Sequence, residues 1–306
     1  MTTPLLPDPE PRRRDYVIIS ADDHLIEPPD LFEDRVAAKH ADAAPKVVET
    51  EAGHQVWRYG GATYPCAGLD VGAGLPREQW TLDPVRFEDM RPGCYDIEAR
   101  IEDMDLAGIW AALCFPGMLA GQSGMPFART RDQELGLALT KAWNDWHIDV
   151  WAGTYPERII GLQLPWLPDP EVAAKEIRAN AARGFKAVVF PEFPTRLRLP
   201  SIHTQHWDPF FAACEETGTV VCLHTGASSW SPVPSPTRPS RPSPRSCRLA
   251  RCSPVPTGSG RGCRCASPTC ASSSSREPWA GCPCWPSGPT TPSTTPWAPR
   301  RCGRAA

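Results

Sequence analysis

The 306-residue sequence has no run of about 18 apolar residues, so we expect no membrane-spanning segment. Its N-terminal stretch, MTTPLLPDPEPRRRD, has no apolar core of the kind that signal peptides carry, which favours a cytoplasmic protein. No G-x-G-x-x-G motif follows a predicted strand, which disfavours a dinucleotide-binding sheet. The formal net charge is −3 at pH 7, and the acidic body of the chain argues against nucleic acid as a partner.

The C-terminal quarter of the chain, residues 231–306, lacks Ile, Phe, Tyr, Lys, Asp, His, Asn, Gln and Met. It holds 16 Pro, 14 Ser, 8 Cys and 11 Arg, with a single Glu. Such a segment cannot bury enough apolar surface to offset chain entropy, so we expect disorder from about Ser231 onward. Its cysteines include C-x-C pairs rather than C-x2-C pairs and have no His nearby, which disfavours a zinc site.

A further hypothesis is that this tail is translated out of frame. Codons for Ser, Cys and Trp mostly begin with T, and a middle T encodes Phe, Leu, Ile, Met or Val. A Ser/Cys-rich stretch is therefore what an apolar stretch becomes in a shifted frame. Decoded one nucleotide earlier, CASSSSRE gives RIVLVEG, the pattern of a buried strand. Sequencing the coding DNA across codons 225–260 tests this, and an uninterrupted frame there would refute it.

Apolar stretches alternate with helical patterns through the first 230 residues. The predicted strands are 16–24, 111–117, 159–166, 186–190 and 220–226. The predicted helices are 97–109, 131–152, 171–183 and 207–218, the last two ending at glycine caps. Short apolar strands that are each followed by a helix imply an α/β fold with a parallel sheet covered on both faces. Eight such units close a (β/α)8 barrel, and this chain supplies about five.

The pattern divides the chain into three parts. Residues 1–15 form an N-terminal arm that we expect to be disordered, and residues 231–306 form the tail. Residues 16–230 form the partial barrel. Within it, residues 25–96 are rich in Pro and Gly, with small strands at HQVWRYG and ATYP. We expect this cap region to pass over the top of the domain rather than enter its core.

Two predicted strands end in side chains that suit a metal ion. The first ends in Asp22-Asp23-His24, and the two-residue period of a strand puts Asp22 and His24 on the same side. The fifth strand ends in His224. Because the carboxyl ends of barrel strands meet at one face, these residues form a candidate site for zinc, manganese or iron. The alternatives are a solvated turn after the first strand and a core histidine in the fifth.

Other residues give weaker signals of function. Three basic residues are candidates for contacts with an anionic substrate, with surface charge as the alternative: Arg131, Lys186 and His206. Three tryptophans at helix or strand positions are expected in the core: Trp143, Trp146 and Trp166. Two cysteines inside apolar strands are expected to be unreactive: Cys114 and Cys222.

Several segments together resemble the amidohydrolase-related family, which includes aminocarboxymuconate-semialdehyde decarboxylase and γ-resorcylate decarboxylase relatives. They are SADDHLIEPPDLF, MRPGCYDIEARIEDMDLAGI, AWNDWH, YPERIIGLQLPW, ARGFKAVVF and HWDPFFAACEETGTVVCLHTG, within about residues 16–230. The resemblance implies a (β/α)8 barrel with one divalent metal, bound through Asp22, His24 and His224. It implies a hydrolase or decarboxylase that acts on a small organic acid, of aromatic or muconate type. It also leaves open whether intact relatives form homo-oligomers.

The sequence departs from the family pattern after His224. The resemblance implies a further metal-binding Asp from the eighth strand and, in many members, a catalytic His from the sixth. No Asp or His follows His224. The decoded tail offers a Glu where many relatives have that His, and the overlapping residue of the chain as given is Arg276. We therefore expect an inactive, poorly soluble form of the enzyme. The alternative is a non-catalytic fragment or a binding protein with a Pro/Arg-rich interaction tail.

Overall fold

The computed structural model describes residues 7–8, 17–66, 71–80 and 83–228. Nearly all of the N-terminal arm and the whole segment 231–306 lie outside these residues, so the expected disorder and the proposed frame change are not tested. All described residues belong to one compact unit, Met1–Ser267. Within the described part, no helix is long and apolar enough to cross a membrane.

The described residues include five parallel strands, which form a two-stranded sheet and a three-stranded sheet. They are β1 (Ile18–His24), β5 (Ile109–Phe115), β6 (Leu162–Gln163), β7 (Ala187–Pro191) and β8 (Val220–His224). β1 pairs with β5, and β7 pairs with both β6 and β8. A parallel bridge between Ala112 and Ile159 joins the two groups, so the strands follow one another in chain order. All five predicted strands are therefore confirmed, with shifted ends.

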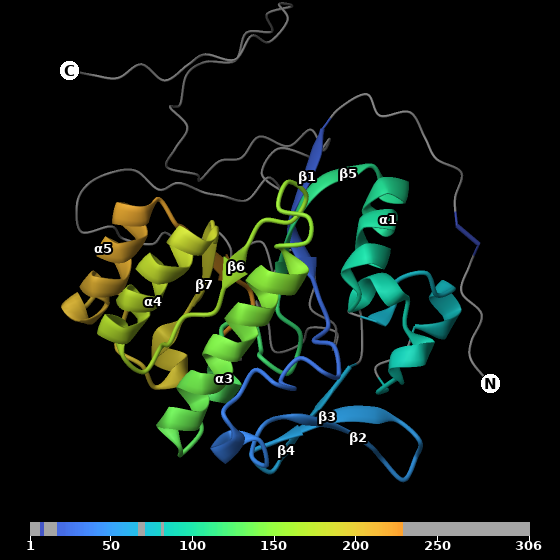
Figure 1. Cartoon of the computed structure of the whole chain (residues 1–306), viewed down its shortest axis with the longest axis horizontal. Helices are drawn as coiled ribbons and strands as arrows, with labels where there is room; N and C mark the ends of the chain where they lie inside the picture. Colours follow the sequence, from blue (N-terminus) through green and yellow to red (C-terminus); the bar gives the residue numbers. More distant parts are fainter. Residues whose placement is uncertain (1–6, 9–16, 67–70, 81–82, 229–306) are drawn as a thin grey trace, which may run out of the picture. The chain divides into compact units, whose positions relative to one another are not determined.

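The part of the chain that the structure describes has five α-helices, which follow or precede these strands. They are α1 (Ile97–Ala107), α2 (Met125–Ala128), α3 (Gln133–Trp146), α4 (Pro170–Arg183) and α5 (Asp208–Thr217). The Asp96 and Asp169 side chains accept hydrogen bonds from the first turns of α1 and α4, while Gly184 and Gly218 end α4 and α5 in left-handed conformations. α3 continues into a π-helical turn, His147–Trp151, which completes the long predicted helix. α4 and α5 pack side by side (Figure 1).

β6 is shorter than the predicted strand because buried side chains take up part of its backbone hydrogen bonding. The Nε2 atom of His147 accepts a hydrogen bond from the Leu162 N–H at 3.2 Å. Asn144 accepts one from the Leu164 N–H at 2.8 Å and donates one to the Leu164 carbonyl at 2.9 Å. Burial lowers the pKa of His147 to about 3, so its ring is neutral and can accept.

The cap region contains a three-stranded antiparallel sheet: β2 (Lys46–Glu49), β3 (Gln55–Tyr59) and β4 (Ala62–Pro65). β3 and β4 were predicted, and β2 was not. The expectation that this region stays outside the core is wrong. Its apolar residues are buried in the same cluster as the strands and α3, among them Leu25, Leu31, Phe32, Trp57 and Met90. A long segment without α-helices therefore still supplies core, because its large apolar side chains point inward.

Short 3-10 turns complete the described part. They are Ala38–His40, Arg77–Gln79, Phe87–Asp89, Pro92–Cys94, Pro194–Leu197 and Gln205–Trp207.

The core has a second cluster, formed by apolar residues of α4, α5 and β7 and their neighbours. The tryptophans expected in the core, Trp143, Trp146 and Trp166, are all buried. Burial raises the pKa of both Cys114 and Cys222 to about 11, so these thiols are poor nucleophiles, as predicted.

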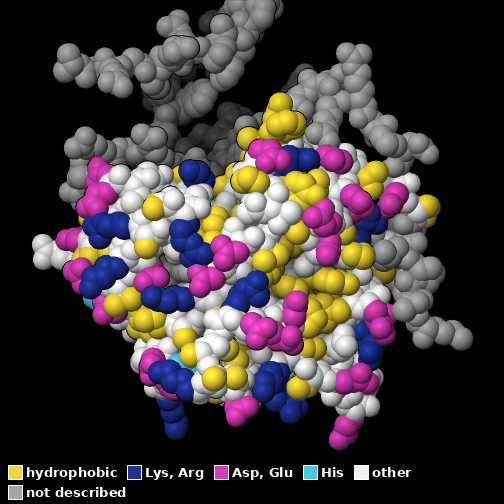
Figure 2. All heavy atoms as spheres, in the orientation of Figure 1, with side chains coloured by type: hydrophobic (Ala, Val, Ile, Leu, Met, Phe, Trp, Pro, Cys, Tyr) yellow, Lys and Arg dark blue, Asp and Glu magenta, His cyan; other side chains and the backbone are white. Residues whose placement is uncertain are grey.

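The surface carries charges of both signs. Figure 2 shows Lys and Arg intermingled with Asp and Glu, and a band of apolar side chains between them. Three of the most exposed large apolar residues lie at the start of the two outer strands, β1 and β8. Val17 and Ile19 at β1 are 72% and 50% exposed, and Val220 at β8 is 44% exposed. Apolar strand edges of this kind favour self-association.

Candidate metal centre

Asp22, His24 and His224 gather at the carboxyl ends of β1 and β8. Each offers one ligand atom, and these atoms all lie within 4.8 Å of one another. The Nε2 atoms of His24 and His224 are 3.0 Å apart, and Nε2 of His224 lies 3.4 Å from Oδ1 of Asp22. Among the residues that the structure describes, this is the one group of three or more His, Cys, Asp or Glu with such spacing.

The end of β1 turns Asp22 and His24 to one side, as the strand period predicts. Asp23, between them, accepts a hydrogen bond from Ser20 Oγ at 2.6 Å. The register of β1 against β5 shifts between Ser20 and Asp23. Arg100 of α1 donates a hydrogen bond to the His24 carbonyl, which ties the end of the strand to α1. The position of His24 is thus fixed through its backbone.

Phe115, the last residue of β5, forms an apolar wall beside both histidines. Its ring centroid lies 5.9 Å from that of His24 and 4.7 Å from that of His224. The two imidazoles meet edge to face, with centroids 4.8 Å apart at 84°. The side chains of His224 and Asp22 are 11% and 35% exposed. The cluster is therefore partly shielded from water and still open to a small ligand.

The donor set fits a divalent transition metal. Two imidazole nitrogens and one carboxylate oxygen are ligands that zinc, iron and manganese accept in proteins. Ligand atoms about 2.0 Å from a tetrahedral zinc ion lie about 3.3 Å apart, because the angle between them is near tetrahedral. Two of the three separations, at 3.0 and 3.4 Å, are close to that value. Three protein ligands and an open position are typical of a catalytic rather than a structural site.

Two of the three predicted substrate contacts, Lys186 and His206, lie away from the cluster. Lys186 is exposed and immediately precedes β7, so it lies at the amino end of the strand, opposite the end that carries the cluster. His206 lies in the 3-10 turn before α5 with its ring edge-on to Trp207 at 4.7 Å. The structure brings neither residue to the cluster, and neither lines the pocket described next.

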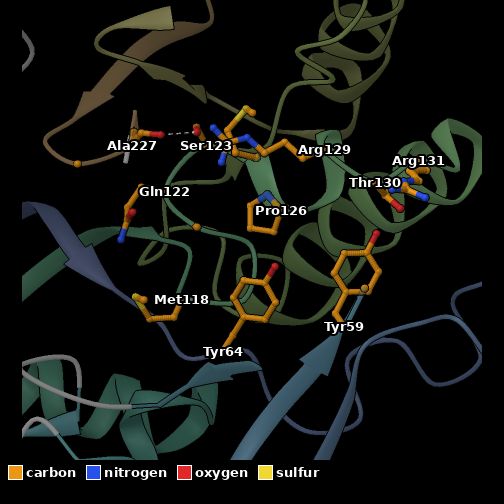
Figure 3. A pocket seen from close by; sticks show the side chains of 14 residues that line it. Tyr59, Tyr64, Met118, Gln122, Ser123, Pro126, Arg129, Thr130, Arg131 and Ala227 are labelled. Carbon is orange, nitrogen blue, oxygen red and sulfur yellow. Dashed lines mark hydrogen bonds between the residues drawn. The ribbon is translucent and has the colours of Figure 1, made fainter. Parts of the chain in front are cut away.

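A pocket of about 1000 Å³ lies among the segments that follow β5 and His224 and the β3–β4 hairpin (Figure 3). Three segments far apart in the sequence line it: the β3–β4 hairpin, the segment that follows β5, and the residues just after His224. The lining residues labelled in Figure 3 are Tyr59, Tyr64, Met118, Gln122, Ser123, Pro126, Arg129, Thr130, Arg131 and Ala227. Arg131, a predicted anion contact, is among them. The rest of the lining was not predicted, because it depends on how the cap region folds against the strands.

The chain that follows His224 is held by side chains from neighbouring loops. Glu192 accepts hydrogen bonds from the N–H groups of Gly226 and Ser228, at 2.7 and 2.9 Å. Ser123 Oγ donates to the Ala227 carbonyl at 3.0 Å. Gly226 has a φ of +95°, a conformation that favours glycine. This wall of the pocket is therefore fixed to the ends of β7 and β5.

Glu27, three residues after His24, is a buried carboxyl that the sequence analysis missed. Its Oε1 accepts hydrogen bonds from the Gly117 N–H at 3.1 Å and from Trp143 Nε1 at 3.3 Å. Burial raises its pKa to about 7, although these hydrogen bonds partly oppose the shift. Glu27 thus joins the segment after β1, the segment after β5 and helix α3. The only sequence signal was an acidic residue within an apolar stretch, Leu25 to Pro28.

A family model described as amidohydrolase matches residues 14–256. The chain belongs to the amidohydrolase family. The family resemblance is confirmed, and with it the (β/α)8 barrel class, of which the described residues form five units. A solved amidohydrolase, map2389c from Mycobacterium avium subsp. paratuberculosis K-10, is 24% identical with a TM-score of 0.54. The match covers 71% of this chain and 61% of map2389c. This chain therefore spans about three fifths of the length of that relative.

Two decarboxylase structures match with lower scores. The 2,6-dihydroxybenzoate decarboxylase from Rhizobium is 15% identical, with a TM-score of 0.41, over 72% of this chain and 52% of that chain. The dihydroxybenzoic acid decarboxylase from Polaromonas sp. JS666, with bound manganese and an inhibitor, is 18% identical, with a TM-score of 0.42, over 71% and 51%. The comparison with curated proteins found no match.

Proposed function

We propose that this amidohydrolase chain carries the metal-binding part of a metal-dependent hydrolase or carboxy-lyase that acts on a small organic acid. The observation that carries the proposal is the approach of His24 and His224 to 3.0 Å, with Asp22 beside them, at the carboxyl ends of barrel strands. These three residues would hold one divalent ion, which we take to be zinc, with manganese or iron as alternatives. A cytoplasmic location remains part of the proposal.

The ion, when bound, supplies a Lewis acid that polarises a carboxylate or carbonyl group of the substrate. The chain's own residues orient the ligands and shape the pocket. Phe115 packs against both imidazoles, and Arg100 fixes the backbone of His24. Glu192 holds the segment after His224, so the pocket wall keeps its place relative to the cluster. Preorganised contacts of this kind cost no rearrangement when the substrate arrives.

We also propose that the chain as given binds the ion weakly and does not turn over substrate. The described cluster has three ligands, and no Asp or His follows His224 in the sequence. The family resemblance implies a fourth ligand and a proton-transferring group in that stretch. Without them the site would lack the further ligand and the proton-transferring group that the resemblance implies, which would weaken metal retention and the chemical step.

The test compares this chain with a variant in which the reading frame after about codon 225 is restored. Both proteins are incubated with Zn²⁺ or Mn²⁺ and with 2,6-dihydroxybenzoate, the substrate named for the Rhizobium relative, and with a muconate-type acid. We expect loss of substrate only with the restored chain, and no loss once His224→Ala is added. Metal-independent turnover, or turnover that survives His224→Ala, would contradict the proposal.

A further inference from the structure

We propose that Ser123 is a positioning residue for the metal centre: through its hydrogen bond to Ala227, the β5 loop (residues 116–123) keeps His224 beside His24. The inference rests on the proposed function, because it takes the cluster as the place where a metal ion binds. It assigns a role in the site to a residue that is not itself a ligand and that no motif in the sequence marks.

The two strands that carry the histidines are not paired with each other. Among the described strands, β1 pairs only with β5, and β8 pairs only with β7. The bridge that joins the two sheets, Ala112 to Ile159, lies between β5 and β6 rather than between β8 and β1. The Nε2 atoms of His24 and His224 nevertheless lie 3.0 Å apart. Contacts outside the strand ladders must therefore keep the end of β8 beside the end of β1.

His224 passes directly into a four-residue turn that ends at Ala227. The Ala227 N–H donates a hydrogen bond to the His224 carbonyl at 3.2 Å. Gly226 has the positive φ, +95°, that the third position of a type II turn requires. Its N–H also donates to Glu192 at 2.7 Å. The Ala227 carbonyl therefore has a fixed position relative to the backbone of His224.

Ser123 joins this turn to the β5 loop. Its Oγ donates a hydrogen bond to the Ala227 carbonyl at 3.0 Å (Figure 3). Ser123 and Ala227 are 1% and 4% exposed, so water cannot readily replace the hydroxyl as a donor. A buried carbonyl that loses its donor is costly, which makes this contact a firm link between the loop and the turn.

The other end of the β5 loop is attached to the segment after β1. The Leu25 N–H donates to the Phe115 carbonyl at 3.0 Å, one residue after His24. The Gly117 N–H donates to the buried carboxyl of Glu27 at 3.1 Å. The loop therefore begins at a point fixed to the end of β1 and reaches, through Ser123, the turn that follows β8.

The loop between these two attachments is itself folded into turns. The Gly121 N–H donates to the Gly117 carbonyl at 2.9 Å, and the Gly124 N–H donates to the Gly121 carbonyl at 3.2 Å. A loop closed by its own backbone hydrogen bonds transmits position better than an open one. A continuous series of hydrogen bonds thus connects the end of β1 to the turn after His224.

Loss of the Ser123 contact should release the turn, and His224 with it. A zinc or manganese ion binds imidazole nitrogens only over a narrow range of distances, so a small displacement of His224 weakens the site. Phe115 provides an internal reference, because it precedes the loop and its ring lies 4.7 Å from that of His224. A shift of His224 would change this separation whether or not an ion is bound.

The first measurement is made on the EDTA-treated full chain with labelled His and Phe. The nuclear Overhauser effect between the rings of Phe115 and His224 reports their separation, and His224→Ala identifies the signal. We expect Ser123→Ala to weaken this effect. Ser123→Thr keeps the hydroxyl donor and should retain it. Circular dichroism and the melting temperature establish that each variant is folded.

The second measurement is the Mn²⁺ dissociation constant of the same proteins. Ser123→Ala should raise it about tenfold, the usual effect of removing a group that orients a ligand, and Ser123→Thr should restore it. Thr140→Val is the matched control. Thr140 is 3% exposed and its Oγ1 donates to the Gly136 carbonyl at 3.0 Å, within α3. This control should lower the melting temperature about as much as Ser123→Ala, but leave the Overhauser effect and the Mn²⁺ affinity unchanged.

Equal effects of Ser123→Ala and Thr140→Val on these two readouts would overturn the proposal, because a general loss of stability would explain both. An unchanged Overhauser effect in folded Ser123→Ala would also overturn it. Gly226→Ala tests the same link from the turn, in case Ser123→Ala does not fold. A Cβ there meets nothing within 4 Å, but the φ of +95° disfavours alanine, so the Overhauser effect should again weaken.

The two readouts also separate this proposal from the proposed function. A weakened Overhauser effect in Ser123→Ala, in a chain that takes up no Mn²⁺, would support the link to His224 and reject the metal centre. Equal Mn²⁺ binding by wild type and Ser123→Ala would support the metal centre and reject the positioning role of Ser123.

Discussion

The Nε2 atoms of His24 and His224 lie 3.0 Å apart although 200 positions separate the two residues. His24 ends β1 and His224 ends β8, the first and last of the five parallel strands in their spatial order. Their contact requires the five strands to bend until the carboxyl ends of the two outer strands meet, as strands do in a barrel. The candidate metal centre therefore lies at the seam between these two outer strands.

Glu27 should make the protein's stability depend on pH. Its pKa is about 7 when folded and near the ordinary value of 4.5 when unfolded, so the folded state holds the extra proton. Stability from this group is full below pH 4.5 and is lost as the pH rises through 7. Replacing Glu27 by Gln removes this dependence. Between pH 5 and pH 8, the unfolding free energy of the variant relative to that of the wild type should rise by about 2 kcal/mol.

Urea unfolding of both proteins at several pH values measures this difference. Glu134, an exposed acid whose pKa an ion pair with Lys39 lowers, provides the control in Glu134→Gln. That control should show no gain over the wild type between pH 5 and pH 8. A constant difference between Glu27→Gln and wild type across this range would mean that Glu27 is charged throughout.

Gly117 is required beside Glu27 because there is no room for a side chain. A Cβ at this position would lie 2.5 Å from Oε2 of Glu27 and 3.0 Å from the Leu25 carbonyl oxygen. Gly117→Ala should therefore lower the unfolding free energy by about 1–3 kcal/mol, the usual cost of overpacking a buried site. In Gly72→Ala the new Cβ meets only Trp80, at 3.5 Å or more, and stability should change much less. Equal melting temperatures for Gly117→Ala and wild type would show that the site relaxes freely.

Asn144 should be a costly residue to replace although it has no part in the chemistry. It satisfies both the N–H and the carbonyl of Leu164 in the core. Asn144→Leu leaves these two buried groups without partners, at a cost of about 2–4 kcal/mol in unfolding free energy. Gln133→Ala removes an exposed hydrogen bond to a backbone carbonyl and should cost less than about 0.5 kcal/mol. Chemical denaturation of both variants decides whether burial sets this difference.

The outer strand β8 should promote self-association. Val220 is 44% exposed at its start, and β8 pairs only with β7 among the described strands. Val220→Lys places a charge on this edge and should shift the protein toward smaller species in size-exclusion chromatography. Ala182→Lys adds the same charge on exposed α4 and should leave the elution profile unchanged. An identical effect of both variants would mean that net charge, not the strand edge, controls association.

The strands and helices could be predicted because their signals are local. Asp169 and Gly184 mark the ends of α4 through backbone geometry that a few neighbouring residues determine. β6 is the exception, since its length depends on His147 and Asn144, which reach it from α3 and the turn after it. The sequence contains no local sign of those contacts.

The residues of the candidate site also differ in whether the sequence alone could predict them. Asp22, His24 and His224 could be proposed because each ends an apolar strand, and parallel strands place their carboxyl ends together. Arg129 and Tyr64 could not, because they meet only through the packing of the cap region against the segment after β5. Lys186 was chosen for its charge alone, and its position at the amino end of β7 places it opposite His224.

Titration with Mn²⁺, followed by electron paramagnetic resonance of the free ion, tests the central claim most directly. Manganese is suitable because it prefers oxygen and imidazole ligands and binds thiolates poorly, so the cysteines of the tail interfere little. We predict weak binding of one ion per chain, lost in His24→Ala and His224→Ala and retained in His203→Ala, which removes an exposed histidine outside the cluster. Equal binding by wild type and His224→Ala, or no binding by wild type, would contradict a metal centre formed by Asp22, His24 and His224.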